Sequence, residues 1–308
     1  MIRYILRRLL FSIPVLLGVT LLIFLLLHFI PGDPIKVYFG LEMNDPELIA
    51  LKREELGLND PLITQYIRFV GDALKGDLGE SIQTLRPVLP DLIDRFKNTA
   101  QLATLSIFIA IVFGITFGLL SALKPYSLLD NFSLGLSLAG ISLPVFWIGL
   151  LLMWLFSVRL GLLPSAGKGD WKNLILPSVA MSGPSMALIA RITRANILEV
   201  IHRDFVRTAK SKGLKENIII IRHILPNALL PTITIIGLQF GYLISGAVLT
   251  ESVFSWPGLG RLIVESIKSR DYPVVMGGVM LIAVIFVIVN LLVDILYGLL
   301  DPRVRTQG

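Results

Sequence analysis

The sequence contains no cysteine, only three histidines, and charged residues at just 16% of its 308 positions. Without cysteine the chain has no disulfide, no thiolate metal site and no cysteine nucleophile. The histidines, His28, His202 and His223, lack the close spacing of a metal-binding pair. We therefore expect no catalytic residue, no metal site and no cofactor on this chain.

Apolar residues occupy 54% of the positions, and the mean hydropathy is +0.77. This composition is too apolar for the surface of a soluble protein. The net charge of +6 does not indicate a nucleic-acid partner, because the basic residues gather at the edges of apolar blocks. Such an excess of lysine and arginine is typical of the cytoplasmic loops of membrane proteins. We expect an integral membrane protein.

Six runs almost free of charge are long enough, or nearly so, to cross a bilayer as helices, which takes about 20 residues. They predict an all-α membrane protein with six transmembrane helices. Several runs also carry small residues four apart, which allow close helix packing in lipid. These pairs are Gly114/Gly118, Gly135/Ala139 and Gly237/Gly241. The runs comprise residues 9–30, 98–123, 131–158, 173–190, 223–250 and 272–293.

The charges between the runs alternate and thereby predict an orientation. The basic segment 195–226 is expected in the cytoplasm together with both termini, and the net acidic segment 31–95 outside. The expected organisation is a membrane helix at 1–30, an extracytoplasmic insert at 31–95, five membrane helices at 96–300 and a cytoplasmic tail at 301–308.

Two short helices are expected in the insert. Asp45-Pro46 and Asp60-Pro61 each provide an N-cap followed by proline at the first helical position, and Gly57 and Gly76 follow as helix stops. The second helix carries an apolar stripe, which predicts that this face packs against another part of the protein. The stripe consists of Ile63, Tyr66, Ile67, Val70 and Leu74.

The segment 204–230 predicts a helix-turn-helix elbow at the cytoplasmic membrane surface. Asp204 is placed to cap the first short helix, and Thr208 and Ala209 give that helix a small-residue face. Gly213 follows a lysine-rich last turn and suits the left-handed backbone that closes many helices. Pro226 is expected in the first turn of the next membrane helix.

The elbow resembles the cytoplasmic loop of the permease subunits of ABC importers. That loop has the pattern Glu-Ala-Ala, three residues, Gly, nine residues, Ile, one residue, Leu-Pro. The Arg-Thr-Ala sequence found here resembles the form that this loop takes in the dipeptide and oligopeptide subfamily. Three other segments also resemble that subfamily: residues 56–82, 251–262 and 294–305. The positions that match are Ala209, Gly213, Leu225 and Pro226, and those that differ are Arg207, Thr208 and His223.

The resemblance implies a type I ABC importer permease fold in the cell membrane of a bacterium or archaeon. The chain would form one half of a pore, and the partner ATPases would hold ATP and Mg²⁺ and perform hydrolysis. The implied partners are a second homologous permease, two cytoplasmic ATPase subunits, an extracytoplasmic solute-binding protein and membrane lipid. In the family the loop docks into a cleft on the ATPase. The residues carried over to this role are Asp204, Arg207, Thr208, Ala209, Lys212, Gly213, Leu225 and Pro226.

Import of di- or oligopeptides is the function that the resemblance implies, with nickel chelates or oligosaccharides as alternatives. Gln101, Gln239 and Asn290 are candidates for lining a polar path, although helix packing is the competing interpretation. The alternative from another class is a stand-alone secondary transporter or channel. No charge pair occupies the middle of a span, where such transporters hold ions. The glycine-rich segment 161–168 also lacks the spacing of a nucleotide-binding loop.

The absence of cysteine makes the expected orientation directly testable. Single cysteines introduced at Thr64 and Ser211 should differ in their reaction with a membrane-impermeant thiol reagent. Thr64→Cys should react in intact cells, because it lies in the acidic insert, and Ser211→Cys only after permeabilisation. Equal labelling of the two sites, or the reverse order, would contradict the orientation.

Overall fold

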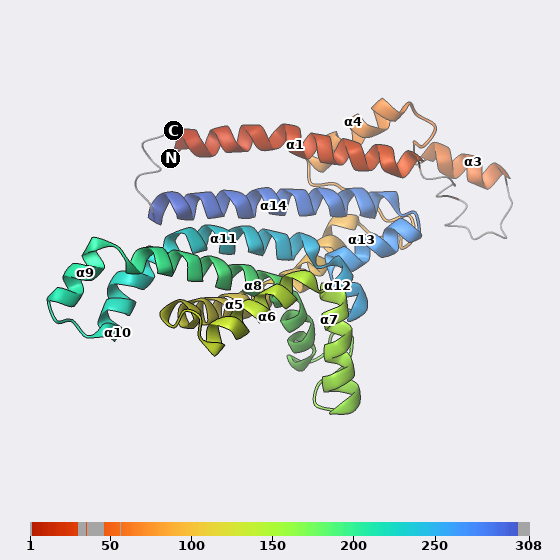
Figure 1. The fold of residues 1–308 in the computed structure, drawn as a ribbon. Helices are drawn as coiled ribbons and strands as arrows, with labels where there is room; N and C mark the ends of the chain where they lie inside the picture. Colours follow the sequence, from red (N-terminus) through yellow and green to blue (C-terminus); the bar gives the residue numbers. More distant parts are fainter. Residues whose placement is uncertain (1, 30–34, 36–45, 56, 301–308) are drawn as a thin grey trace. The chain divides into compact units, whose positions relative to one another are not determined.

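The computed structural model describes residues 2–29, 35, 46–55 and 57–300 (Figure 1). Among these residues the regular structure is helical, with a single isolated bridge between Glu80 and Pro87. The expected all-α membrane protein is confirmed, with five spans, or six if one bent helix pair counts as a span. Asp45 and the tail 301–308 lie outside the described residues. The five spans are Arg7–Phe29, Val88–Leu123, Lys172–Ile201, Glu216–Gly246 and Tyr272–Ile295.

The chain divides into two compact units, each of which is described by itself. The first unit comprises Ala100–Trp256 and the residues from Ile288 on, and the second comprises Ile2–Thr99 and Pro257–Val287. Two long helices, α5 and α14, contribute to both units. The described helices outside the elbow are α1 (Ile2–Phe29), α3 (Pro46–Glu55), α4 (Leu62–Ala73), α5 (Val88–Leu123), α6 (Leu128–Ser142), α7 (Val145–Leu152), the π-helix η1 (Met153–Arg159), α8 (Lys172–Ile201), α11 (Leu225–Gly246), α12 (Val248–Val253), α13 (Leu259–Lys268) and α14 (Tyr272–Leu300).

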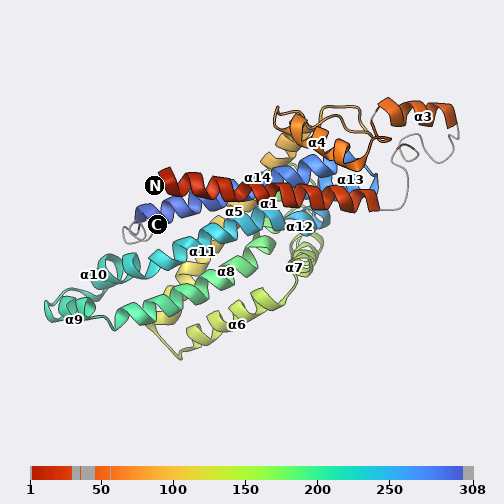
Figure 2. The same cartoon turned by 90° about the horizontal axis from the view of Figure 1, so that it is seen from above.

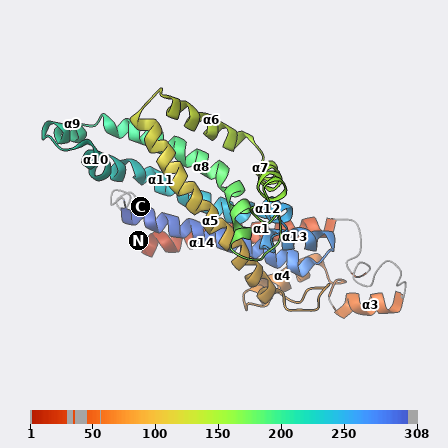
Figure 3. The ribbon, with the colours of Figure 1, turned by 90° about the horizontal axis from the view of Figure 1, so that it is seen from below.

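The run expected to form one continuous span at 131–158 is broken. Helix α6 ends at Ser142, and the helix formed by α7 and η1 is bent away from it by 109° (Figure 3). Leu143 between them has extended backbone angles, φ −87° and ψ 134°. The ring of Pro144 disfavours the helical conformation of the preceding residue by steric contact. Proline therefore explains the break, which the hydropathy of the run did not reveal.

Small residues bring α5 and α8 together in the first unit. A Cβ atom on Gly118 would lie 2.6 Å from the Ala190 carbonyl oxygen, so the backbones themselves are in contact here. The predicted role of Gly114/Gly118 in helix packing is confirmed. Gly135 has open space at its Cβ position, and α6 instead approaches α8 at Gly140. The packing role predicted for Gly135/Ala139 is thus wrong at Gly135.

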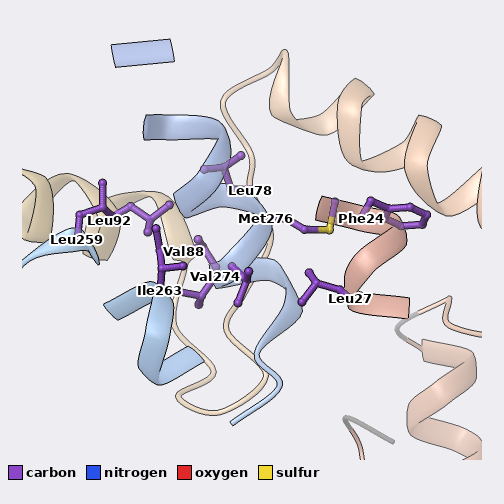
Figure 4. Close-up of a cluster of buried hydrophobic side chains, with 10 residues drawn as sticks. Phe24, Leu27, Leu78, Val88, Leu92, Leu259, Ile263, Val274 and Met276 are labelled. Atoms are coloured by element: carbon purple, nitrogen blue, oxygen red, sulfur yellow. The ribbon is translucent and has the colours of Figure 1, made fainter. Parts of the chain in front are cut away.

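The second unit has its own apolar core (Figure 4). Side chains from α1, from the segment that leads into α5, from the start of α5, from α13 and from the start of α14 meet in it. The carboxylate of buried Asp271 accepts hydrogen bonds from the Ser81 hydroxyl and, at 3.1 Å, from the Ile82 amide. These bonds fix the end of the insert to the start of α14. The core residues are Phe24, Leu27, Leu78, Val88, Leu92, Leu259, Ile263, Val274, Val275 and Met276.

The two short helices of the insert are present, and the start of the second differs from the prediction. Pro46 is the first residue of α3 as predicted, but α4 begins at Leu62, so Pro61 and not Asp60 is its N-cap. The Asp60 carboxylate instead pairs with Arg68. The predicted stops are confirmed, since Gly57 and Gly76 have φ of +64° and +83°.

The close contact between α5 and α8 predicts different outcomes for two glycine substitutions. Gly118→Leu should lower the stability of the purified protein by about 1–3 kcal/mol, because the side chain overpacks a backbone contact. Gly135→Leu is the matched control, because nothing lies within 4 Å of its Cβ position. The measurement is the thermal unfolding midpoint in detergent. Equal losses in both variants would contradict the close packing.

Candidate functional site

The elbow projects beyond the ends of α8 and α11 (Figure 1). It consists of α9 (Asp204–Ser211), a turn, α10 (Glu216–Ile219) and the π-helix η2 (Ile220–Ile224), which leads into α11 (Leu225–Gly246). The predicted helix-turn-helix arrangement is therefore present. The expected second short segment, however, is continuous with the following span, which runs from Glu216 to Gly246.

Helix α9 begins at Asp204 itself, one residue earlier than the predicted cap implies. Arg203 occupies the N-cap position with extended angles, φ −71° and ψ 150°, and its side chain makes no capping hydrogen bond. Asp204 is instead the first helical residue. An acidic side chain in the first turn still interacts favourably with the positive end of the helix dipole. The prediction of Asp204 as N-cap is wrong, because the chain is still extended at Arg203 after leaving α8.

The turn of the elbow is closed by Gly213. Its φ is +70°, a left-handed conformation that strains residues with a Cβ atom. The Gly213 amide donates to the Lys210 carbonyl at 3.0 Å, and the Leu214 amide donates to the Ala209 carbonyl at 3.4 Å. These two bonds form a Schellman motif, the common helix ending with glycine in this position. The predicted conformation of Gly213 is confirmed.

The second limb of the elbow accommodates a proline without a break. Pro226 lies in the first turn of α11, as predicted, directly after the wider π-helical turn of η2. In a regular helix its ring would meet the carbonyl four residues earlier, and one backbone hydrogen bond would be missing. The Asn227 side-chain amide donates to the His223 carbonyl at 2.7 Å and satisfies an acceptor beside this irregular turn. The limb therefore stays helical from the elbow into the span.

Apolar side chains attach the elbow to the spans. Ala209 is only 5% exposed and packs inside this chain's own cluster, so its side chain does not form part of an outer docking face. Thr208 and Ala209 therefore do not form one small-residue face as predicted, because Thr208 is exposed and Ala209 is buried. The cluster comprises Ala122 of α5, Ile197 and Val200 of α8, Val206 and Ala209 of α9, Ile219 of α10, Ile224 of η2 and Ala228 of α11.

The outer face of α9 is polar and has small side chains at its centre. Helical periodicity places Asp204, Arg207, Thr208 and Ser211 opposite the buried Val206 and Ala209, and all four are exposed. The Thr208 and Ser211 hydroxyls donate to the carbonyls of Asp204 and Arg207, both at 3.0 Å. These bonds hold the hydroxyls against the helix. A partner could thus approach the middle of this face closely.

A buried ion pair lies in the same unit and was missed by the sequence analysis. Asp130 in the first turn of α6 is paired with Arg194 of α8 through two parallel bonds, Nε–Oδ1 at 2.8 Å and Nη2–Oδ2 at 2.9 Å. The Ser121 hydroxyl of α5 donates to the same carboxylate, and so does the Tyr126 amide at 2.8 Å. The Asp130 side chain is only 2% exposed. One carboxylate therefore joins α5, α6 and α8; we name this group the Asp130 anchor.

The Asp130 anchor also stabilises an unusual turn. Tyr126 between α5 and α6 has a φ of +61°, which costs of order 1–3 kcal/mol for a residue with a side chain. Its amide bond to Asp130 helps to hold this conformation. The available signal was Arg194 only a few residues after the uncharged run 173–190, since charged residues within spans usually face the protein interior and find partners.

The three polar candidates within spans have different environments. Gln239 of α11 accepts a hydrogen bond from the Ser185 hydroxyl of α8 at 2.9 Å, which favours a role in helix packing. Gln101 of α5 is exposed, and Asn290 of α14 is partly buried.

These features define a class, a multi-pass helical membrane protein with a basic elbow packed onto the ends of its spans. Residues 114–306 match the family described as binding-protein-dependent transport system inner membrane component. Residues 1–103 match the N-terminal region described for the same kind of membrane component. The chain belongs to this family, the permeases of peptide ABC importers, and is a transport subunit.

Relatives at about 40% identity match 99% of this chain. The dipeptide transport system permease protein DppB of Alkalihalophilus pseudofirmus is 40% identical over 99% of this chain and 100% of its own length. The glutathione transport system permease protein GsiC of Pectobacterium atrosepticum is 43% identical over 99% of both chains. GsiC of Escherichia coli is 41% identical over the same shares.

Solved structures support the fold. The inward-facing MetNI methionine ABC transporter matches with a TM-score of 0.57 and 20% identity, over 68% of this chain and 96% of that chain. An amino acid ABC transporter matches with a TM-score of 0.52 and 19% identity, over 70% and 94%. At this identity the likeness shows the fold alone, and it confirms the ABC importer permease fold expected from the sequence.

The Asp130 anchor predicts a strong and coupled effect on stability. Arg194→Ala should destabilise the protein by about 3–5 kcal/mol, because it leaves a carboxylate buried without its cation. The double variant Asp130→Ala/Arg194→Ala should lose less than the sum of the single variants. Thermal unfolding of the purified chain in detergent measures both.

Arg191→Ala is the matched control, because Arg191 is an exposed arginine on the same helix. Its effect should stay within about 0.5 kcal/mol. Additive losses from the two single variants would show that the pair does not act as a unit.

Proposed function

We propose that this chain is a pore-forming permease subunit of an ATP-driven importer of di- or oligopeptides. The observation that carries the substrate class is the end-to-end similarity to a dipeptide permease and to glutathione permeases. Dipeptides and glutathione are short peptides, so the shared class is a short peptide. Nickel chelates and oligosaccharides remain the alternative substrates for the same architecture.

The proposed assembly contains a second homologous permease, two cytoplasmic ATPases and an extracytoplasmic solute-binding protein. The ATPases supply ATP and Mg²⁺ chemistry, and this chain supplies half of the pore. The proposed orientation places both termini and the elbow in the cytoplasm, because the elbow is rich in lysine and arginine. The insert then lies on the side of the binding protein.

We propose the elbow as the surface that receives the ATPase. Asp204, Arg207 and Thr208 lie on the exposed face of α9, and Lys212 and Gly213 form the exposed turn beside it. Ala209, Leu225 and Pro226 have a different role: they belong to the part that packs against or continues into the spans. Movement of the outer face therefore reaches α8 and α11 through apolar contacts.

The proposed function is tested by reconstitution. Vesicles that contain this chain, its partner permease and the two ATPases should take up a labelled dipeptide when binding protein and ATP are present. Competition with glutathione, a nickel chelate and an oligosaccharide identifies the substrate class. Uptake by this chain alone without ATP would instead support a secondary transporter or channel.

Two elbow variants in the same vesicles test the coupling surface. Thr208→Trp adds bulk to the outer face without touching the cluster, so the chain should insert normally while ATPase co-purification and uptake fall. A loss of about 3 kcal/mol in association would weaken it roughly a hundredfold. Gly213→Val should act similarly, because a β-branched residue resists positive φ and would redirect the turn.

Lys215→Ala is the control, because it removes an exposed base that follows the turn. If the elbow were only a positively charged anchor for orientation, Lys215→Ala should matter more than Thr208→Trp. Normal uptake and normal ATPase retention in both Thr208→Trp and Gly213→Val would show that the ATPase binds elsewhere.

A further inference from the structure

Helix α4 of the insert has three distinct faces. One face packs onto the core of the second unit through Tyr66, Phe69 and Ala73. A second face is polar and includes the exposed Thr64 and Arg68. The third face is apolar and faces away from the core, although the sequence predicted that the whole stripe would pack. Its members are Ile63, 68% exposed, Ile67, 63% exposed, Leu74, 84% exposed, and the partly buried Val70.

The contacts of α4 place it beside the span α1 and not beyond its end. The Tyr66 hydroxyl donates to the Leu17 carbonyl at 2.9 Å and lies 3.0 Å from the Thr20 hydroxyl. About two turns closer to the end of α1 than Thr20, Gln65 contacts the His28 ring at 3.3 Å. Figure 2 shows α4 alongside the half of α1 that is remote from its N-terminus.

The length of α1 gives the depth in the bilayer at which Tyr66 contacts this span. The span Arg7–Phe29 has its middle close to Leu17. The twelve residue steps from Leu17 to Phe29 correspond to about 18 Å of helix, more than half of a hydrocarbon core of about 30 Å. Tyr66 therefore reaches a level at which α1 is surrounded by acyl chains, and the body of α4 lies between this level and the membrane surface.

The surface of α1 at the same level is apolar as well. Three leucines of α1 lie between Thr20, which contacts Tyr66, and His28, which contacts Gln65. Each is at least 41% exposed: Leu21, Leu22 and Leu26. Exposed leucines on a membrane span are covered by lipid wherever no partner protein covers them. The outward face of α4 thus lies at a depth where the surrounding medium is hydrocarbon.

We propose that α4 is an in-plane membrane helix whose apolar face, Ile63, Ile67, Val70 and Leu74, is covered by phospholipid acyl chains. Amphipathic helices of this kind bury an apolar face about 5–10 Å into the boundary between headgroups and acyl chains, with the polar face toward water. Here the core contact with α1 fixes the helix in that position. The inference depends on α1 being a membrane span and is independent of the transported substrate.

Spin labels on the full chain test the proposal, because there is no native cysteine to remove. Single cysteines at Ile67 and Leu74 carry a nitroxide, in vesicles of phosphatidylethanolamine and phosphatidylglycerol. Collision with oxygen, which concentrates in lipid, should be several-fold more frequent than collision with a water-soluble nickel chelate. Thr64→Cys on the polar face should show the opposite order, and Leu22→Cys of α1 provides the lipid-facing reference.

The other occupants give different signals. Nickel collisions at Ile67 and Leu74 that equal those at Thr64 would mean that the face lies in water and would overturn the proposal. Low collision with both reagents would mean that protein covers the face, which would also overturn it. Ile67→Trp provides a second measurement, because brominated acyl chains should quench its added fluorescence more strongly than that of Thr64→Trp.

Discussion

Satisfaction of the backbone hydrogen bonds within the hydrocarbon is the constraint on which the structure depends. A peptide group without a partner in lipid costs several kcal/mol, so a span must be helical. Proline disturbs this arrangement, and Pro144 and Pro226, both next to a helix start, show two different outcomes. At Pro144 the helix stops, and a new one starts at an angle of 109°. At Pro226 the helix continues after a widened π-turn, with the Asn227 side chain satisfying the His223 carbonyl.

The same constraint governs charge. An arginine within a span is tolerated when its guanidinium is paired, and Arg194 meets a carboxylate that is itself bonded by a hydroxyl and a backbone amide. Replacing such a pair by apolar residues is often neutral or stabilising, so its value is more readily found in specificity than in stability. The pair fixes the register of α6 against α8. We therefore regard the Asp130 anchor as a positioning device.

The features that the sequence predicted correctly depend on local chemistry. Span length follows from uncharged runs, and the closure of α9 follows from a glycine after a lysine-rich turn. The direction of Ala209 was not predictable, because it depends on a cluster that includes Ala122 and Ala228. The Asp130–Arg194 pair joins residues 64 positions apart in the chain, so no local pattern contains it. The outward face of α4 was missed because an apolar stripe can pack on protein or on lipid.

The distribution of rigid and bent connections suggests where motion would enter the spans if the elbow docks on an ATPase as proposed. The apolar cluster holds α9 against the ends of α5, α8 and α11, and the Asp130 anchor holds the start of α6 against α5 and α8. The elbow and these helix ends would therefore move together. Leu143 and Pro144 interrupt the backbone ladder between α6 and α7, so bending there breaks no helical hydrogen bond. If the elbow and these helix ends move as one group, the angle between that group and α7 changes at Leu143 and Pro144. It does not change within the elbow.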